Sequence, residues 1–144
     1  MSSKSPGQAL LTAFYEYLLI TLPVGLFVTL DASYKQEPHF LWHSPEWAIA
    51  TIFLLFQGLS LYVRHLSNSG AKVSPTSVGL LALVSLLVTA LTVINAYQAL
   101  DENRNTPSSI AFRLTLFGLV SAAFLMLVAG AKLYHIRRGG GPDA

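Results

Sequence analysis

This chain contains four long apolar stretches, and they limit its possible folds more than any other feature of the sequence. A helix needs about 20 apolar residues to cross the hydrocarbon core of a bilayer. The stretches of about this length are residues 10–30, 48–66, 78–97 and 110–134. Of the 144 residues, 53% are hydrophobic and 11% are charged, and the mean hydropathy is +0.54. Because a soluble chain carries about 25% charged residues, these stretches predict membrane-spanning helices.

Each apolar stretch is preceded by a helix start signal. A hydroxyl side chain accepts a backbone N–H at the helix start, and the following proline has no N–H of its own to leave unpaired. The signals are Ser5-Pro6, Ser44-Pro45-Glu46, Ser74-Pro75 and Thr106-Pro107. The two patterns together predict an all-α fold, a polytopic transmembrane four-helix bundle. It would form a single domain over residues 1–144, with a flexible tail at residues 139–144. A cleaved signal peptide is less consistent with the first stretch, which is long and contains Glu16.

Basic residues are unevenly divided between the two predicted sides of the membrane. Cytoplasmic loops are enriched in Lys and Arg, and six basic residues fall on the side of the termini: Lys4, Arg64, Lys72, Lys132, Arg137 and Arg138. Three fall on the other side: Lys35, Arg104 and Arg113. This asymmetry predicts that both termini are cytoplasmic, and we expect a multi-pass protein of the bacterial inner (plasma) membrane.

The sequence offers no motif for catalysis. It has no cysteine, no Gly-rich phosphate loop, no Ser-His-acid arrangement and no H-E-x-x-H, so we expect neither an enzyme nor a cofactor. His39 and His43, with Glu37 and Glu46 nearby, come closest to a metal-ligand pattern. However, prolines interrupt any helix that would hold both histidines on one face, and no metal site is expected.

The first span contains two candidate functional residues. Glu16 is the only acid well inside a predicted span, and ionisable residues at such depth are functional candidates. It could instead form a structural ion pair with Arg64 or Lys132 at the inner ends of neighbouring helices. Pro23, followed by Gly25, predicts a bend. The bend is either a hinge or constriction, or a fixed kink that improves packing.

The third span has a stripe of small and hydroxyl side chains on one face. Its members are spaced 3, 4, 3 and 4 residues apart, and Asn95 lies beside them: Ala82, Ser85, Thr89, Thr92 and Ala96. Such a face either packs closely on another helix or lines a narrow pore.

Other polar or small residues in the spans extend this set of candidates. The fourth span has a similar pattern at Gly118, Ala122 and Met126. Gln57 is an isolated amide near mid-depth of the second span, expected to bond to another helix or to form a ring around an oligomer axis. Arg113 at the outer mouth and Lys132 at the inner mouth complete the pore or gating candidates.

One segment resembles a known family. Pro45-Glu46-Trp47-Ala48 running on to Phe56-Gln57-Gly58, after a first span with a central proline, covers about 14 residues. It resembles small multi-spanning membrane proteins of bacterial anti-phage defence operons, such as the membrane effector of Hailong-type systems. The resemblance implies an oligomeric channel or pore controlled by a partner nucleotidyltransferase or its nucleic-acid product. It assigns no site residue.

These observations predict a homo-oligomeric ion channel or pore of antiviral defence, in contact with lipids and ions. One protomer of four helices encloses no aqueous path, so conduction needs an axis shared between copies. Basic residues at both mouths would favour anions. Two alternatives stay open. One is a small proton-coupled multidrug-type transporter that uses Glu16. The other is a non-catalytic membrane assembly subunit with Arg137 and Arg138 as docking or lipid-contacting charges.

Overall fold

The computed structural model describes residues 6–36, 40–68, 74–101 and 104–139, and in these residues the fold consists of helices joined by short turns, with no strand. The helices are α1 (Pro6–Lys35), α2 (Phe40–His43), α3 (Glu46–Asn68), α4 (Pro75–Ala99) and α5 (Pro107–Gly139). Each long helix contains one of the predicted spans, and each is long and apolar enough to cross a membrane. The prediction of an all-α bundle of four long helices is therefore confirmed.

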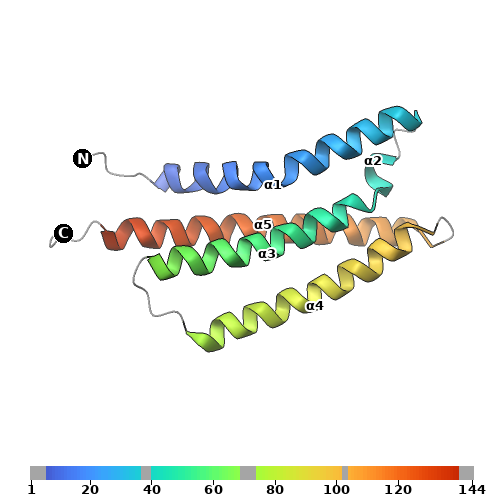
Figure 1. Cartoon of the computed structure of the whole chain (residues 1–144). Helices are drawn as coiled ribbons and strands as arrows, with labels where there is room; N and C mark the ends of the chain where they lie inside the picture. Colours follow the sequence, from blue (N-terminus) through green and yellow to red (C-terminus); the bar gives the residue numbers. More distant parts are fainter. Residues whose placement is uncertain (1–5, 37–39, 69–73, 102–103, 140–144) are drawn as a thin grey trace.

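The four long helices form a bundle with two central members (Figure 1). α3 and α5 pack against each other along most of their length. α1 packs on α5 and α3 from one flank, and α4 packs on α3 and α5 from the other. Pro6 and Gly139 lie at the same end of the bundle, which is called the terminal end below (Figure 1).

The predicted start signals coincide with helix starts. α1, α4 and α5 begin at a proline of a signal, and α3 begins at Glu46. Thr106 Oγ1 accepts a hydrogen bond from the Ser109 N–H at 3.3 Å. Ser74 makes no such side-chain bond, so there the proline alone marks the start. Ser5 lies outside the described residues.

The helices extend further than the apolar stretches. α1 continues to Lys35, and α5 continues to Gly139, the first residue of the predicted tail; residues 140–144 lie outside the described residues. The short helix α2 is not predicted by the sequence. It is tied to the start of α3 because Trp47 Nε1 donates a hydrogen bond to the Leu41 carbonyl at 2.6 Å.

The hydrophobic core lies between α1, α3 and α5. Ala13, Leu54 and Phe124 are almost completely buried there. Gly58 on α3 permits the close approach of α5, since a Cβ atom at this position would lie 2.9 Å from Phe124 Cδ2. A larger side chain at position 58 would therefore push α3 and α5 further apart.

α1 changes direction about half-way along its length (Figure 1). Pro23 lies inside this helix. A proline cannot donate to the carbonyl four residues earlier, and its ring crowds that turn, so a bend follows. The predicted bend is therefore present, and it tilts the second half of α1 away from the first.

Candidate functional site

Glu16 of α1 forms an ion pair with Lys132 of α5. Lys132 Nζ lies 2.9 Å from Glu16 Oε1, and the side chains are 10% and 26% exposed for Lys132 and Glu16, respectively. The second oxygen, Oε2, is buried and has no hydrogen-bond partner among the described residues. Of the two partners considered from the sequence, the structure selects Lys132.

Arg113 lies at the centre of a polar cluster at the end of the bundle opposite the terminal end. Its side chain is only 2% exposed. Nε donates to Asn95 Oδ1 at 2.8 Å, and Nη2 donates to Asn105 Oδ1 at 3.3 Å. Nη1 donates to the carbonyls of His43 at 2.7 Å and Ser44 at 3.3 Å. One guanidinium therefore joins the α2–α3 junction to α4 and α5.

Asn95 extends this cluster. Its Nδ2 donates to both the carbonyl and the hydroxyl of Ser109, each at 3.1 Å. Asn95 and Arg113 were both predicted as pore or gating candidates, and the structure brings them together. Both side chains bond to groups of other segments of the same protomer. These fixed acceptors satisfy the buried guanidinium of Arg113.

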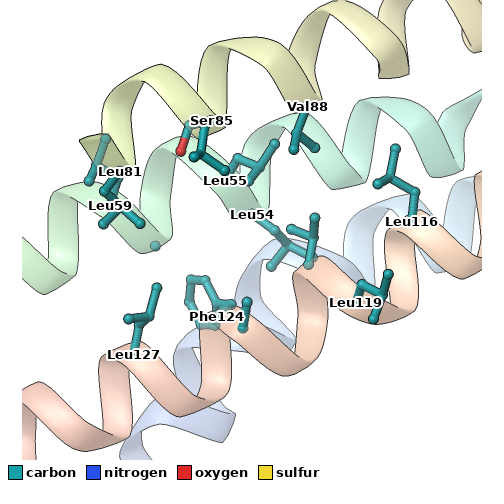
Figure 2. Close-up of a pocket in the computed structure, with 14 residues that line it drawn as sticks. Leu54, Leu55, Leu59, Leu81, Ser85, Val88, Leu116, Leu119, Phe124 and Leu127 are labelled. Carbon is teal, nitrogen blue, oxygen red and sulfur yellow. The ribbon is translucent and has the colours of Figure 1, made fainter. Parts of the chain in front are cut away.

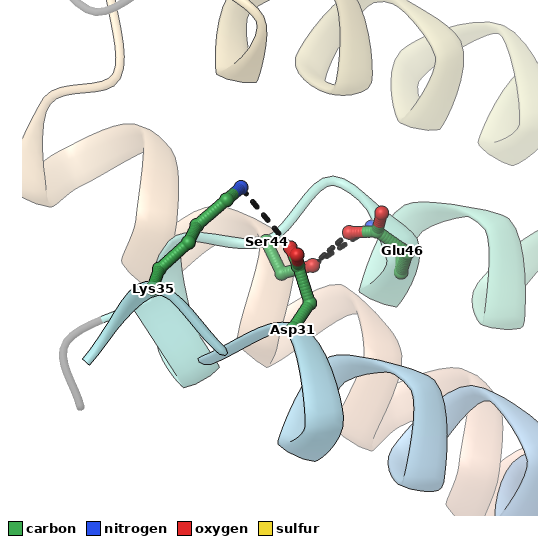
Figure 3. A network of polar contacts seen from close by, with 4 residues as sticks. All are labelled: Asp31, Lys35, Ser44 and Glu46. Carbon is green, nitrogen blue, oxygen red and sulfur yellow. Dashed lines mark hydrogen bonds and ion pairs between the residues drawn. The ribbon is translucent and has the colours of Figure 1, made fainter. Parts of the chain in front are cut away.

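Two further polar contacts lie near the α2–α3 junction (Figure 3). Lys35 Nζ is 3.1 Å from Asp31 Oδ2, one turn apart at the end of α1. The Ser44 hydroxyl donates to the Glu46 carboxylate, and the Glu46 N–H donates to Ser44 Oγ at 3.4 Å. Ser44 and Glu46 therefore form a local cap for α3, which the start signal predicts.

The small stripe of α4 faces into the protomer. Ser85 and Thr92 are buried and Thr89 is half-buried, whereas Leu87 between them and Leu83 just before them are exposed. The Thr89 hydroxyl donates to the Ser85 carbonyl and the Thr92 hydroxyl to the Val88 carbonyl, each at 2.7 Å. These hydroxyls are satisfied by their own helix, and the stripe is a packing surface within the protomer.

The outward face of α3 is polar in its half nearer the terminal end. Four exposed side chains follow each other at spacings of 3, 4 and 3 residues: Gln57, Ser60, Arg64 and Ser67. We call this set the α3 polar face. The described residues provide no hydrogen-bond partner for the Gln57 amide. Of these four residues, only Gln57 was predicted from the sequence as a pore candidate, although the helical spacing of the other three indicates the same face.

The other half of the same outward face carries large apolar side chains. Ile49, Phe53 and Phe56 are 46%, 55% and 46% exposed. The face thus changes from bulky hydrophobic to polar close to the middle of α3.

The small residues of α5 face outward. Gly118 and Ala122 are exposed, and Met126 is 71% exposed. A Cβ at Gly118 would meet no heavy atom within 4 Å. The packing expected for these residues does not occur inside the protomer, because α5 uses its opposite side for α3.

No metal-binding group is formed by the described residues. Among them, no three His, Asp or Glu side chains gather closely enough to hold an ion. The backbone carbonyl of His43 accepts a hydrogen bond from Arg113 Nη1. Glu37 and His39 lie outside the described residues.

No protein-family model, curated protein or solved structure matches the chain.

Proposed function

We propose that copies of this protein assemble into an ion channel in which the α3 polar face lines the conducting path. The observation that carries the proposal is the exposed Gln57 amide, for which the described residues provide no hydrogen-bond partner. The charged and amide candidates on the other helices are engaged with each other: Glu16 with Lys132, and Asn95 with Arg113. Among the predicted candidates, Gln57 is therefore a polar group still available to a shared axis.

The depth of Gln57 makes its exposure costly in lipid. It lies 11 residues from Glu46 and 11 from Asn68, about 16 Å from each end of α3 at ~1.5 Å per residue. This places it near the centre of a hydrocarbon core about 30 Å thick. An amide without hydrogen bonds costs several kcal/mol there. Water in a path between copies, or the same amide of a neighbouring copy, removes that cost.

The apolar half of the outward α3 face would form the gate of the closed channel. Phe53 and Phe56 would surround the axis next to the polar half. A narrow ring of such side chains blocks ions by excluding water. Rotation or tilting of α3 that moves the Phe53 and Phe56 side chains away from the axis would open the path.

Arg64 indicates the sign of the conducted ion. It is exposed on the α3 polar face, and the described residues offer it no carboxylate partner. A ring of such cations at one mouth raises the local concentration of anions. We therefore propose anion selectivity.

The cellular setting is proposed from the sequence. The resemblance of residues 45–58 favours a defence effector opened by a partner nucleotidyltransferase or its nucleic-acid product. The excess of Lys and Arg on the side of the termini favours a bacterial inner membrane with that side cytoplasmic. The ion pair of Glu16 occupies the carboxylate that a proton-coupled transporter would use, which favours the channel over that alternative.

Cysteine accessibility in planar bilayers tests the proposal, and the chain has no native cysteine to interfere. Gln57→Cys and Ser60→Cys are expected to react with an anionic, water-soluble methanethiosulfonate and to change the chloride current. Leu86→Cys is the matched control, because Leu86 is 61% exposed on the outer face of α4 near mid-depth.

Three results would overturn the proposal. Equal reactivity at positions 57 and 86 would show that α3 does not line the path. A reversal potential on the cation side of a salt gradient would remove the anion assignment. Silent bilayers with and without the co-expressed partner, together with proton-driven dye efflux from vesicles, would move the function to a transporter.

A further inference from the structure

A cavity of about 270 Å³ lies between α3, α4 and α5. Figure 2 shows leucines from all three helices around it, with Phe124 at its base. Two of its lining residues, Val84 and Leu119, are 47% and 64% exposed. The cavity is therefore open to the surroundings of the bundle between α4 and α5.

Its walls exclude water as a stable occupant. The lining is apolar except for the hydroxyl of Ser85, together with the backbone. An ordered water needs two to four polar partners, and apolar cavities of about 150 Å³ stay dry and accept molecules such as benzene. A helix about 10 Å in diameter is too large to enter a space of about 270 Å³.

The shape of the cavity fits a linear hydrocarbon. Along α5 the lining extends from Leu116 to Leu127, which are 11 residues apart and so about 16 Å apart along the axis. We propose that the cavity binds one acyl chain of a membrane lipid. The chain would lie parallel to α4 and α5 and fill the space left where α4 packs mainly on α3.

The depth of the cavity determines which part of the lipid is recognised. Leu116 lies 9 residues from the start of α5 and Leu127 lies 12 residues from its end. Both ends of the cavity are therefore more than about 13 Å from the helix termini. The distal part of the chain enters, and the headgroup stays outside, so binding is independent of headgroup chemistry. This site is separate from the α3 polar face and does not depend on channel function.

Photolabelling of the full-length protein in phosphatidylcholine vesicles tests this site. The probe is phosphatidylcholine with a diazirine near the methyl end of one chain. Mass spectrometry is expected to show labelling of Val84, Leu119 or Leu127 several-fold above that of Leu86 and Leu91, which face outward on α4. Phosphatidylglycerol with the same chain should label equally, and a diazirine near the carboxyl end should label these residues several-fold less.

Two filling variants and a control distinguish a bound chain from general lipid contact. Ala123→Phe fills the cavity from α5, and Val84→Trp covers its exposed edge without changing the core. Both should lower the labelling of Leu119 and Leu127 to that of Leu86. Ala90→Phe, on the exposed side of α4, should leave it unchanged. Even labelling of all lipid-facing residues, labelling that depends on the headgroup, or labelling that survives in Val84→Trp would overturn the proposal.

Discussion

Arg113 and Lys132, both buried among the described residues, are held by groups from other parts of the bundle. Lys132 faces Glu16, and Arg113 faces carbonyl and amide oxygens. The sequence could predict that Glu16 pairs, but not with which cation, because Arg64 and Lys132 are both near the same end. The choice depends on packing: α1 lies beside α5, and Arg64 is on the outward side of α3.

A double-mutant cycle measures the Glu16–Lys132 pair. Glu16→Gln should be milder than Glu16→Ala in thermal unfolding, because the amide still fills the site and accepts a hydrogen bond. Glu16→Gln and Lys132→Met should be coupled by about 0.5–3 kcal/mol. The same cycle with Arg64→Met serves as the control and should be additive. Coupling to Arg64 in place of Lys132 would contradict the arrangement of α1 and α5.

Gly58 is the residue where backbone approach is most sensitive to a single methyl group. Gly58→Ala should lower the free energy of unfolding by about 1–3 kcal/mol, because the added Cβ overlaps the buried Phe124 ring. Gly79→Ala is the control, since a Cβ there meets no heavy atom within 4 Å. Phe124→Leu should restore part of the loss in Gly58→Ala. Equal melting of the two Gly→Ala variants would argue against the close contact of α3 and α5.

At the scale of elements, the sequence identified each long helix but not the face that each helix uses. The start signals at Pro6, Pro75 and Pro107 marked three helix starts because their chemistry is local. The stripes of α4 and α5 look alike in sequence, yet the first is inside the protomer and the second is outside. This difference comes from the order of packing, in which α5 is central and already covered on its other side. α2, with four residues, is too short for any periodicity to reveal.

The two stripes should respond differently to leucine. Thr89→Leu should reduce the stability of the isolated protomer, because the larger side chain enters the packed side of α4. Ala122→Leu should leave protomer melting unchanged and weaken the oligomer instead, because small exposed residues allow copies to approach. Melting in detergent and cross-linking measure the two effects. An unchanged assembly in Ala122→Leu would indicate that this face of α5 contacts lipid.

At the scale of the whole molecule, four long helices, each long and apolar enough to cross a membrane, place both described chain ends at one end of the bundle (Figure 1). The number of these helices could be predicted from apolar length alone. The central position of α3 and α5 could not be predicted in this way, because hydropathy does not separate these two helices from α1 and α4. The contacts between the helices are made by side chains far apart in the sequence.

Reporter fusions test the crossing number and the orientation. A fusion at position 35 and one at the C-terminus should report opposite sides of the membrane, with the C-terminus cytoplasmic because basic residues gather there. A fusion at position 70 provides the control and should match the C-terminus. Reporters at position 35 and the C-terminus on the same side would contradict the four-span arrangement.

Arg113 follows all of its hydrogen-bond acceptors in the chain, and this order affects how α5 is assembled during synthesis. Its acceptors belong to His43, Ser44, Asn95 and Asn105, all of which leave the ribosome before it. α5 is synthesised after these residues, so Arg113 meets acceptors that are already present when α5 packs against them. Loss of the α2–α3 junction would leave this guanidinium in lipid with fewer acceptors, and a nascent chain with that defect should be retained by the insertion machinery or degraded.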